Sequence, residues 1–314
     1  MTEQLPEGLT EHDPYNILVA RFPQGRSEDP DSADWLITTV LEMNNDPRIN
    51  QTLRYRKDDT PITMSRNDCL DKALSSNVDF LLMLDSDMSP DCNLESNGAV
   101  DGFMEGAKPF WKTSFDFAVK QRLAGTPCTV GAPYLGPSPH NNVYVFQWTT
   151  INDKFETAPE MKLSQFGREE SSRMRGITEV AALPTGVILI DMLAVKEYAK
   201  HHKPPFFYYE WDDEKEMNKA STEDVTFTRD MSLAGFKQYC NWDAWAGHWK
   251  RELVKGPPLV ITPDQLAKKF CDAVRSKDRL MNRPTNTRLM EAKDGKVFEL
   301  NNNGSRISDH SFAR

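Results

Sequence analysis

The sequence has few cysteines and no long apolar run, and both deficits narrow the classes of protein that it can encode. Its five cysteines are an odd number and none belongs to a C-x-x-C pair. This argues against a disulfide framework and a paired-cysteine zinc site, and it predicts a reducing, cytoplasmic location. No apolar stretch approaches the roughly 18 residues of a membrane-spanning helix. The acidic, polar N-terminal segment predicts neither a signal peptide nor a transit peptide.

Basic residues are fewer than acidic ones, and they are unevenly distributed along the chain. The chain of 314 residues has 38 Lys and Arg against 47 Asp and Glu, a net charge of −9. Residues 1–248 carry 24 basic and 39 acidic side chains, a net charge of −15, whereas residues 249–314 have a net charge of +6. An acidic body binds the backbone of nucleic acids or an anionic membrane poorly. We expect the basic tail to be a solvated appendage; docking onto the body or contact with phosphate groups is the alternative.

Apolar segments alternate with amphipathic ones at the start of the chain. Tyr15–Phe22 is a short apolar run that predicts a buried first strand. Asp79–Leu84 is apolar without alternation, which is typical of a strand covered on both faces of a parallel sheet. Between them, hydrophobic spacing predicts helices over residues 34–45 and 63–75, separated by a strand at residues 52–56. This order indicates a doubly wound α/β sheet, in which ligands bind beyond the carboxyl ends of the strands.

The rest of the chain is less regular. Residues 153–175 are charged and aperiodic, which predicts a loop. We expect a polar leader at residues 1–14, one domain at residues 15–250, and a partly helical basic tail at residues 251–314, with a helix over Pro263–Arg275 and a disordered end NNNGSRISDHSFAR. Further predicted elements are helices over residues 110–124, 193–201 and 221–234, and strands over residues 129–134, 143–149, 179–183, 187–191 and 206–209.

Two carboxylates follow the most apolar predicted strand. In Asp85-Ser86-Asp87, strand alternation sends both acidic side chains to the same side, with a small residue between them. Two hard oxygen ligands at a strand end suit Mg²⁺ or Mn²⁺ bridging a diphosphate. The alternative is a pair of turn-forming aspartates, because D-x-D is common by chance.

Two later patterns combine structural and chemical roles. Ser221-Thr222-Glu223-Asp224 begins a predicted helix, where Ser221 with Asp224 forms a capping pattern and acidic residues favour the helix N-terminus. The same carboxylates suit a general base. His248 lies among tryptophans, whereas the other five histidines lie in the leader, a loop, a helix end or the tail. An imidazole beside two carboxylates would shift the preference of a bound ion from Mg²⁺ toward Mn²⁺. A partly buried histidine among tryptophans is the alternative.

The strand FLLMLDSDM, preceded by the segment MSRNDCLDKAL, resembles the nucleotide-sugar-binding half of GT-A-fold glycosyltransferases, particularly family 2-like members. The resemblance covers about residues 15–250. It implies a Rossmann-like, doubly wound, mostly parallel central sheet with a smaller acceptor-side subsheet, followed here by a helical tail. It also implies a donor site in which residues after the first strand border the base. These donor-site residues are Arg21, Phe22, Pro23, Arg66, Asn67, Asp85 and Ser86.

The same resemblance assigns the metal, the base and the acceptor site. By this resemblance, we expect Asp87 to ligate the metal directly, Asp85 to contact ribose or a metal-bound water, and His248 to be a further ligand. In the T-E-D segment we favour Asp224 as general base, with Glu223 as the alternative. The remaining implied residues are Pro184, Thr185, Gly186, Glu210 and Trp211 at the acceptor, with Tyr208 and Tyr209 beside it, and Lys250 and Arg251 near the leaving diphosphate.

These implications predict a metal-dependent transferase that moves one sugar from a UDP- or GDP-sugar to a hydroxyl of a glycan or small molecule, with inversion favoured. The Q-x-x-R-W motif of processive family 2 enzymes is absent, which argues against a polysaccharide synthase. Three alternatives remain open. They are a nucleotidyltransferase acting on a sugar phosphate, a phosphatase with a D-x-D nucleophile, and a catalytically inactive carbohydrate-binding scaffold.

Overall fold

The computed structural model describes most of the first 254 residues and three short segments beyond them. The described residues are 14–23, 30–58, 61–94, 104, 106–136, 142–151, 160–212, 218–249, 253–254, 287–291, 297–301 and 306–310. The chain divides into two compact units, Met1–Val260 and Ile261–Arg314. Among these residues, no helix is long and apolar enough to cross a membrane.

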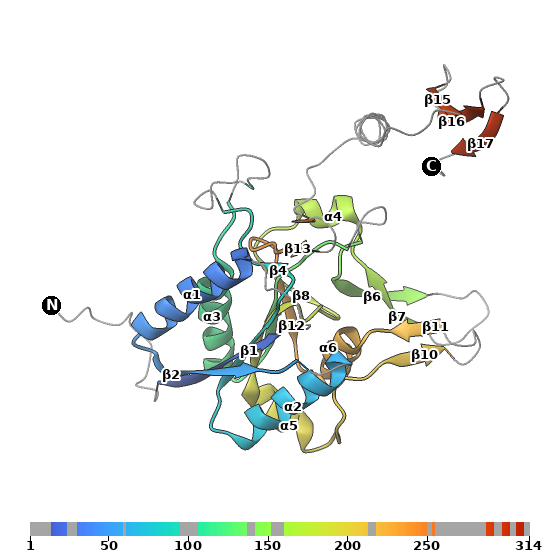
Figure 1. The fold of residues 1–314 in the computed structure, drawn as a ribbon. Coiled ribbons are helices and arrows are strands. Elements are labelled where there is room, and N and C mark those ends of the chain that lie inside the picture. Colours follow the sequence, from blue (N-terminus) through green and yellow to red (C-terminus); the bar gives the residue numbers. More distant parts are fainter. Residues whose placement is uncertain are drawn as a thin grey trace. The chain divides into compact units, whose positions relative to one another are not determined.

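The first unit is built around a mixed seven-stranded sheet (Figure 1). Three of its six strand pairs are parallel and three are antiparallel. In their order across the sheet, the strands are β2 (Ile49–Arg56), β1 (Tyr15–Phe22), β3 (Phe80–Asp85), β9 (Val187–Asp191), β5 (Thr129–Gly131), β12 (Gln238–Asn241) and β8 (Ile177–Val180).

Helices cover both faces of this sheet and bury two separate apolar clusters (Figure 1). One cluster joins the sheet to α1 (Pro30–Asn45) and α3 (Phe110–Leu123). The other joins it to α2 (Ile62–Ser75), α5 (Met192–Ala199) and α6 (Glu223–Leu233). β3 contributes to both clusters, Phe80 and Leu82 to the first and Leu81 and Met83 to the second, so it is buried on both faces.

Smaller elements surround the central sheet. Directly after β3, the chain forms β4 (Met88–Ser89). This strand belongs to a three-stranded sheet with β13 (Gly247–Trp249) and β14 (Leu253–Val254). The other elements of the first unit are the hairpin of β6 (Phe146–Ile151) and β7 (Glu160–Gln165), the short helix α4 (Arg168–Arg173), and the hairpin of β10 (Glu210–Asp212) and β11 (Asn218–Ser221). The second unit contains an antiparallel sheet of β15 (Thr287–Glu291), β16 (Val297–Asn301) and β17 (Arg306–His310).

The strand–helix order of the first 85 residues is confirmed, but several expectations are wrong. The sheet is mixed and not mostly parallel. The expectation of a parallel sheet failed because an apolar run that is buried on both faces carries no information about strand direction. Residues 153–175 contain β7 and α4, and residues 206–209 precede β10 without forming a strand. Strand β17 lies within the C-terminal segment expected to be disordered. The expected helix Pro263–Arg275 lies outside the described residues.

Candidate active site

The Asp85-Ser86-Asp87 segment connects the central sheet to the small sheet. Asp85 ends β3 and pairs in register with Phe22 at the end of β1. Its backbone N–H donates to the carbonyl of Gly186 at 2.9 Å, which fixes the loop before β9 beside the acidic segment. Asp87 immediately precedes β4, and all three side chains of the segment are half-buried. The two carboxylates therefore lie at the carboxyl end of the sheet, where the fold is expected to bind ligands.

A buried arginine joins this segment to α6. Arg66 of α2 is only 3% exposed, and its Nη2 donates to Oδ1 and Oδ2 of Asp85 at 3.0 and 2.8 Å. Its Nη1 donates to Oε1 of Glu223 at 2.6 Å. The Arg66 guanidinium also lies 5.9 Å from the ring centroid of Phe22. One cation thus holds two carboxylates that are far apart in the sequence.

The charges of this cluster perturb one another. Burial raises the pKa of Asp85, and Asp87 raises it further, while Arg66 opposes both. Burial would lower the pKa of Arg66, but Asp85, Asp224 and Glu223 together hold it above its ordinary value. The guanidinium therefore stays charged, and its positive charge favours the ionised form of the neighbouring carboxylates.

Asp87 faces His248 across the small sheet. The pairing of β4 with β13 places His248 opposite Met88, and the N–H of Trp249 donates to the Asp87 carbonyl at 2.7 Å. His248 Nε2 lies 3.4 Å from Asp87 Oδ2. His248 Nδ1 lies 3.2 Å from the carbonyl oxygen of Leu135, which can only accept, so we assign the hydrogen to Nδ1. The Nε2 atom then faces the Asp87 carboxylate, an arrangement that a proton on Nε2 or a bound cation stabilises.

The residues at this position fit a divalent ion that shares its shell with a substrate. Within the described part of the chain, no cluster of three or more His, Cys, Asp or Glu side chains could hold a metal ion. Asp87 and His248 offer one oxygen and one nitrogen, and ions such as Mg²⁺ and Mn²⁺ usually complete their shell with water and phosphate oxygens. Both carboxylate oxygens of Asp85 already accept from Arg66, so direct ligation by Asp85 would compete with that ion pair.

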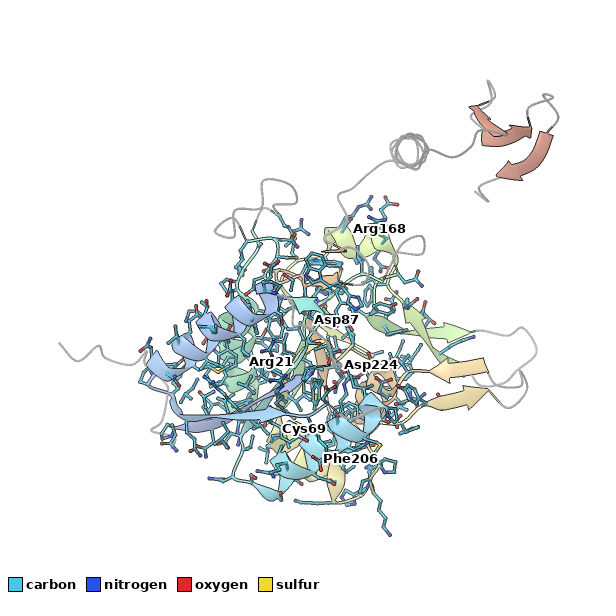
Figure 2. All side chains as sticks on the ribbon, viewed as in Figure 1. Arg21, Cys69, Asp87, Arg168, Phe206 and Asp224 are labelled. Carbon is cyan, nitrogen blue, oxygen red and sulfur yellow. The ribbon has the colours of Figure 1, made fainter. Side chains whose placement is uncertain are left out.

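Glu223 and Asp224 have different surroundings at the start of α6. Asp224 is labelled in Figure 2. Glu223 is buried and bonded to Arg66, and it also bonds to Tyr209. Asp224 is half-buried, and its Oδ1 accepts from the Thr222 hydroxyl and from the N–H of Val225 at 2.9 Å. Among the hydrogen bonds between described residues, none reaches Asp224 Oδ2. The helix begins after Thr222, so the expected Ser221 cap is wrong; Thr222 occupies the N-cap position, and its side chain makes no capping hydrogen bond.

Asn67 has a positioning role. Its Oδ1 accepts from the N–H groups of Phe206 and Phe207 at 2.9 and 3.0 Å, and its Nδ2 donates to the carbonyls of Thr63 and Phe207. These bonds engage both ends of the amide and anchor the chain before Tyr208. The structure therefore does not bring the Asn67 side chain into the Arg66 cluster, where we expected it to lie near a nucleotide.

The residues expected to border a base divide between the two faces of the sheet. Phe22 and Pro23 are buried at the end of β1, and Phe22 packs on the α2 side. Arg21 is half-buried and lines a cavity beside α1.

The residues expected at an acceptor are only partly gathered at this site. Pro184, Thr185 and Gly186 are buried, and a Cβ on Gly186 would lie 3.0 Å from both Met88 Sδ and Tyr134 Cε1. Glu210 instead forms an ion pair with Arg229 at 2.6 Å. The side chain of Trp211, as well as Lys250 and Arg251, lies outside the described residues.

Tyr134 is a member of this site that the sequence did not reveal. Its ring packs edge-on against His248 with centroids 5.0 Å apart, and it contacts the space beside Gly186. Burial raises the pKa of Tyr134 well above its ordinary value, and Asp224 and Asp85 raise it further. The phenol therefore stays neutral. A tyrosine shortly after a short apolar strand gives no sequence signal for such a position.

No family model matches the sequence, and no curated protein matches it at a significant level. Among solved structures, A197 from STIV is 16% identical, with a TM-score of 0.43, over 78% of this chain and 96% of that chain. GalNAc-T7, solved with UDP, GalNAc and Mn²⁺, is 10% identical, with a TM-score of 0.37, over 77% of this chain and 45% of that chain. Both are distant likenesses, with TM-scores below 0.5.

Proposed function

We propose that the protein is a metal-dependent glycosyltransferase that transfers one sugar from a UDP- or GDP-sugar to a hydroxyl of a glycan or small molecule, with inversion. The observation that carries this proposal is the approach of Asp87 to His248 Nε2, at 3.4 Å, beside the buried Arg66–Asp85 pair. A cation position next to a fixed positive charge, at the carboxyl end of a central strand, suits the diphosphate of a nucleotide sugar.

Asp87 and His248 would hold the divalent ion, with Mn²⁺ favoured over Mg²⁺ by the nitrogen ligand. When bound, the ion would neutralise charge that develops on the departing diphosphate. Arg66 adds a second positive charge that does not depend on the ion, because its pKa lies above its ordinary value. Its orientation is fixed by Asp85 and Glu223 on two sides of the guanidinium.

Asp224 is better placed than Glu223 to act as the general base. The Glu223 carboxylate is engaged by Arg66 and Tyr209, so accepting a proton there would weaken the ion pair that orients Arg66. Asp224 is half-buried at the helix N-terminus, with its two described hydrogen bonds on Oδ1. Oδ2 would accept the proton of the acceptor hydroxyl as that oxygen attacks the anomeric carbon.

The remaining assignments follow the same site outward. We propose that Phe22 and Pro23 at the end of β1 border the base, and that Ser86 lies against the donor. Pro184, Thr185 and Gly186 would shape the acceptor side together with Tyr134, and Trp211 would provide an aromatic face for a sugar. Glu210 would reach an acceptor only if its ion pair with Arg229 opened.

The test combines a screen of sugar-nucleotide donors with substitutions of the two proposed metal ligands. We expect Mn²⁺-dependent release of free nucleoside diphosphate from one sugar nucleotide of a UDP- and GDP-sugar panel. Asp87→Asn and His248→Gln should abolish this release, whereas Asp71→Asn, which alters an exposed carboxylate of α2, should leave it unchanged. Release of pyrophosphate would instead indicate nucleotidyl transfer. Sugar binding without any effect of Mn²⁺ or of Asp87→Asn would contradict the proposal.

A further inference from the structure

The strand β2 forms one edge of the central sheet. Among the described strands it pairs with β1 alone, so its outer side has no partner there. It has eight residues and no proline, and its pairing with β1 is regular from Gln51 to Arg56. Proteins commonly protect sheet edges with short strands, prolines or bulges, because an exposed edge is a template for pairing with another chain. Residues 51–56 therefore form a long, regular edge without these protections.

The direction of the backbone groups along β2 follows from its contact with β1. The N–H of Lys57, the residue after the strand, donates to the carbonyl of Arg21 at 3.3 Å. Backbone groups of successive strand residues point alternately to the two sides of a strand. The groups of Leu53 thus face β1, and those of Thr52 and Arg54 face outward. The outer side presents N–H and C=O groups to which a further strand can bond.

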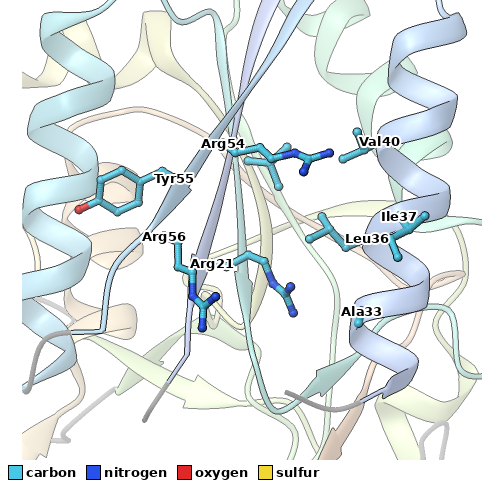
Figure 3. A pocket seen from close by; sticks show the side chains of 9 residues that line it. Arg21, Ala33, Leu36, Ile37, Val40, Arg54, Tyr55 and Arg56 are labelled. Carbon is cyan, nitrogen blue, oxygen red and sulfur yellow. The ribbon is translucent and has the colours of Figure 1, made fainter. Parts of the chain in front are cut away.

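Helix α1 exposes apolar side chains beside this edge. Ile37 and Leu41 are 59% and 57% exposed and lie one turn apart. Ile37 lines a cavity of about 360 Å³ together with Arg54 of β2 (Figure 3). This contact places the Ile37–Leu41 stripe on the side of α1 that borders β2. Exposed apolar side chains that gather in this way are typical of protein–protein contacts.

Helix α2 does the same on the other face of the sheet. Met64 is 56% exposed, and Asp68, one turn later, accepts a hydrogen bond from the Tyr55 hydroxyl of β2. Figure 3 shows Tyr55 on the opposite side of β2 from the α1 residues. Among the described residues, three of the five exposed large apolar side chains therefore border this one strand.

We propose that β2 pairs antiparallel with β2 of a second copy of this chain, so that a homodimer contains one continuous sheet. An isolated strand bound at this edge would engage the backbone but leave the apolar residues of both helices exposed. A second copy related by a twofold axis perpendicular to the sheet keeps each face on its own side. Its α1 then lies beside α1, and its α2 beside α2, so both apolar patches are covered together with the strand edge.

The charges along β2 favour the antiparallel arrangement. Its first five residues are uncharged, and its two arginines, Arg54 and Arg56, lie in the second half. The outward backbone groups of Thr52 and Arg54 bond to each other across the dimer when the twofold axis passes through Leu53. Each Arg54 then lies opposite the uncharged Thr52 of the other copy. An in-register parallel pair would instead set like charges directly opposite one another, which is destabilising.

Sedimentation velocity on the full chain measures the association. We expect a species with twice the 35.8 kDa mass of the chain. Ile37→Glu combined with Met64→Glu should raise the dimer dissociation constant by roughly 100-fold, because two apolar contacts become charges that face their own symmetry copies. The matched control is Leu233→Glu, at a leucine of α6 that is 66% exposed, and it should leave the association unchanged.

Thr52→Pro tests the strand pairing itself. It removes an outward N–H, and proline is tolerated in an edge strand where that group faces away from the neighbouring strand. We expect this variant to be monomeric with the circular dichroism of the unmodified protein. Amide hydrogen exchange gives a second measure that needs no proline. The N–H groups of Thr52 and Arg54 should exchange more slowly in the unmodified protein than in the double variant at Ile37 and Met64.

Three results would overturn the proposal. The first is a full chain that sediments as a monomer at every concentration at which it stays soluble. The second is a dimer that the double variant weakens no more than Leu233→Glu does, because that dimer uses another surface. The third is slow exchange at Thr52 and Arg54 in a monomer, which would show that another segment of the same chain occupies the edge.

The double variant and the exchange rates decide the matter even if Thr52→Pro fails to fold. None of these measurements uses a sugar nucleotide or a metal ion. Their outcomes therefore do not depend on the glycosyltransferase proposal.

Discussion

Arg66 is the residue on which the geometry of the site depends. It is buried and donates to carboxylates from two different elements, Asp85 after β3 and Glu223 at the start of α6. Removing a charge from such a group leaves its partners uncompensated in the interior, which costs more than the intact pairing contributes. The ion pairs therefore specify how α2, β3 and α6 meet, more than they add to stability.

The neighbouring carboxylates Glu223 and Asp224 should respond differently to amide substitution. Glu223→Gln weakens the buried ion pair with Arg66, so we expect it to lower the free energy of unfolding by about 1 to 3 kcal/mol. Asp224→Asn leaves that pair intact and should change stability little, while it lowers kcat by roughly 10² to 10⁴ through loss of the proposed base. Urea denaturation and single-turnover kinetics measure the two effects. A larger kinetic loss in Glu223→Gln at full stability would assign the base to Glu223 instead.

At the scale of elements, Asp91 connects the turn after β4 to the helices α1 and α3. Its Oδ2 accepts from Trp35 Nε1 of α1 at 2.7 Å, and its Oδ1 accepts from the N–H of Phe110 at the start of α3 at 2.8 Å. Burial raises the pKa of Asp91 to about 6; these two hydrogen bonds oppose the rise, and Glu42 adds to it. The ordinary value is 3.8, so the folded state binds the proton more tightly than the unfolded state.

This difference predicts how stability depends on pH. The contribution of the Asp91 carboxyl is fully present below about pH 4 and is lost as pH rises to about 6, since the folded state then holds the proton no longer. The stability of the unmodified protein relative to Asp91→Asn should thus fall between pH 4 and pH 7, by up to about 3 kcal/mol. Chemical denaturation at several pH values measures this. A constant difference across that range would show that Asp91 titrates normally.

The sequence predicts the elements of this fold better than their mutual arrangement. Strand β1 and helix α3 follow the expected bounds, because apolar runs and helical spacing are local signals. The direction of β9 is not local, since an apolar strand reads the same in either direction. Met64 illustrates a further limit: it is apolar and lies in α2, yet it is 56% exposed, because the buried residues of this helix, such as Arg66 and Leu70, lie on another face.

The candidate site also combines residues that local sequence signals reveal with contacts that they do not reveal. The D-x-D segment and the acidic start of α6 were found because charged residues directly follow or begin regular elements. The bond between Arg66 and Glu223 spans 157 positions, and no spacing rule connects them. Asn67 was placed near a nucleotide by resemblance, whereas its amide bonds to the backbone of Phe206 and Phe207. Side-chain partners of this kind depend on tertiary packing.

At the scale of the whole molecule, acidic and basic residues are concentrated in different parts of the chain. The acidic excess belongs to residues 1–248, where part of it forms the proposed site, and the basic excess belongs to the remainder. The described members of both buried clusters lie between Tyr15 and Ala246, all of them within the first unit.

We therefore expect residues 1–260 to fold without the second unit. Such a protein keeps the seven-stranded sheet and also β13, which carries His248 opposite Met88 of β4. Its thermal midpoint and Mn²⁺-dependent donor hydrolysis should match those of the full chain, because no described core residue is removed.

A second truncation to residues 1–246 is the informative comparison, since it removes β13 and β14 but leaves the central sheet. It should stay folded by circular dichroism and lose its response to Mn²⁺. If residues 1–260 fail to fold, the basic tail is part of the body's stability; if residues 1–246 still respond to Mn²⁺, His248 is not a ligand.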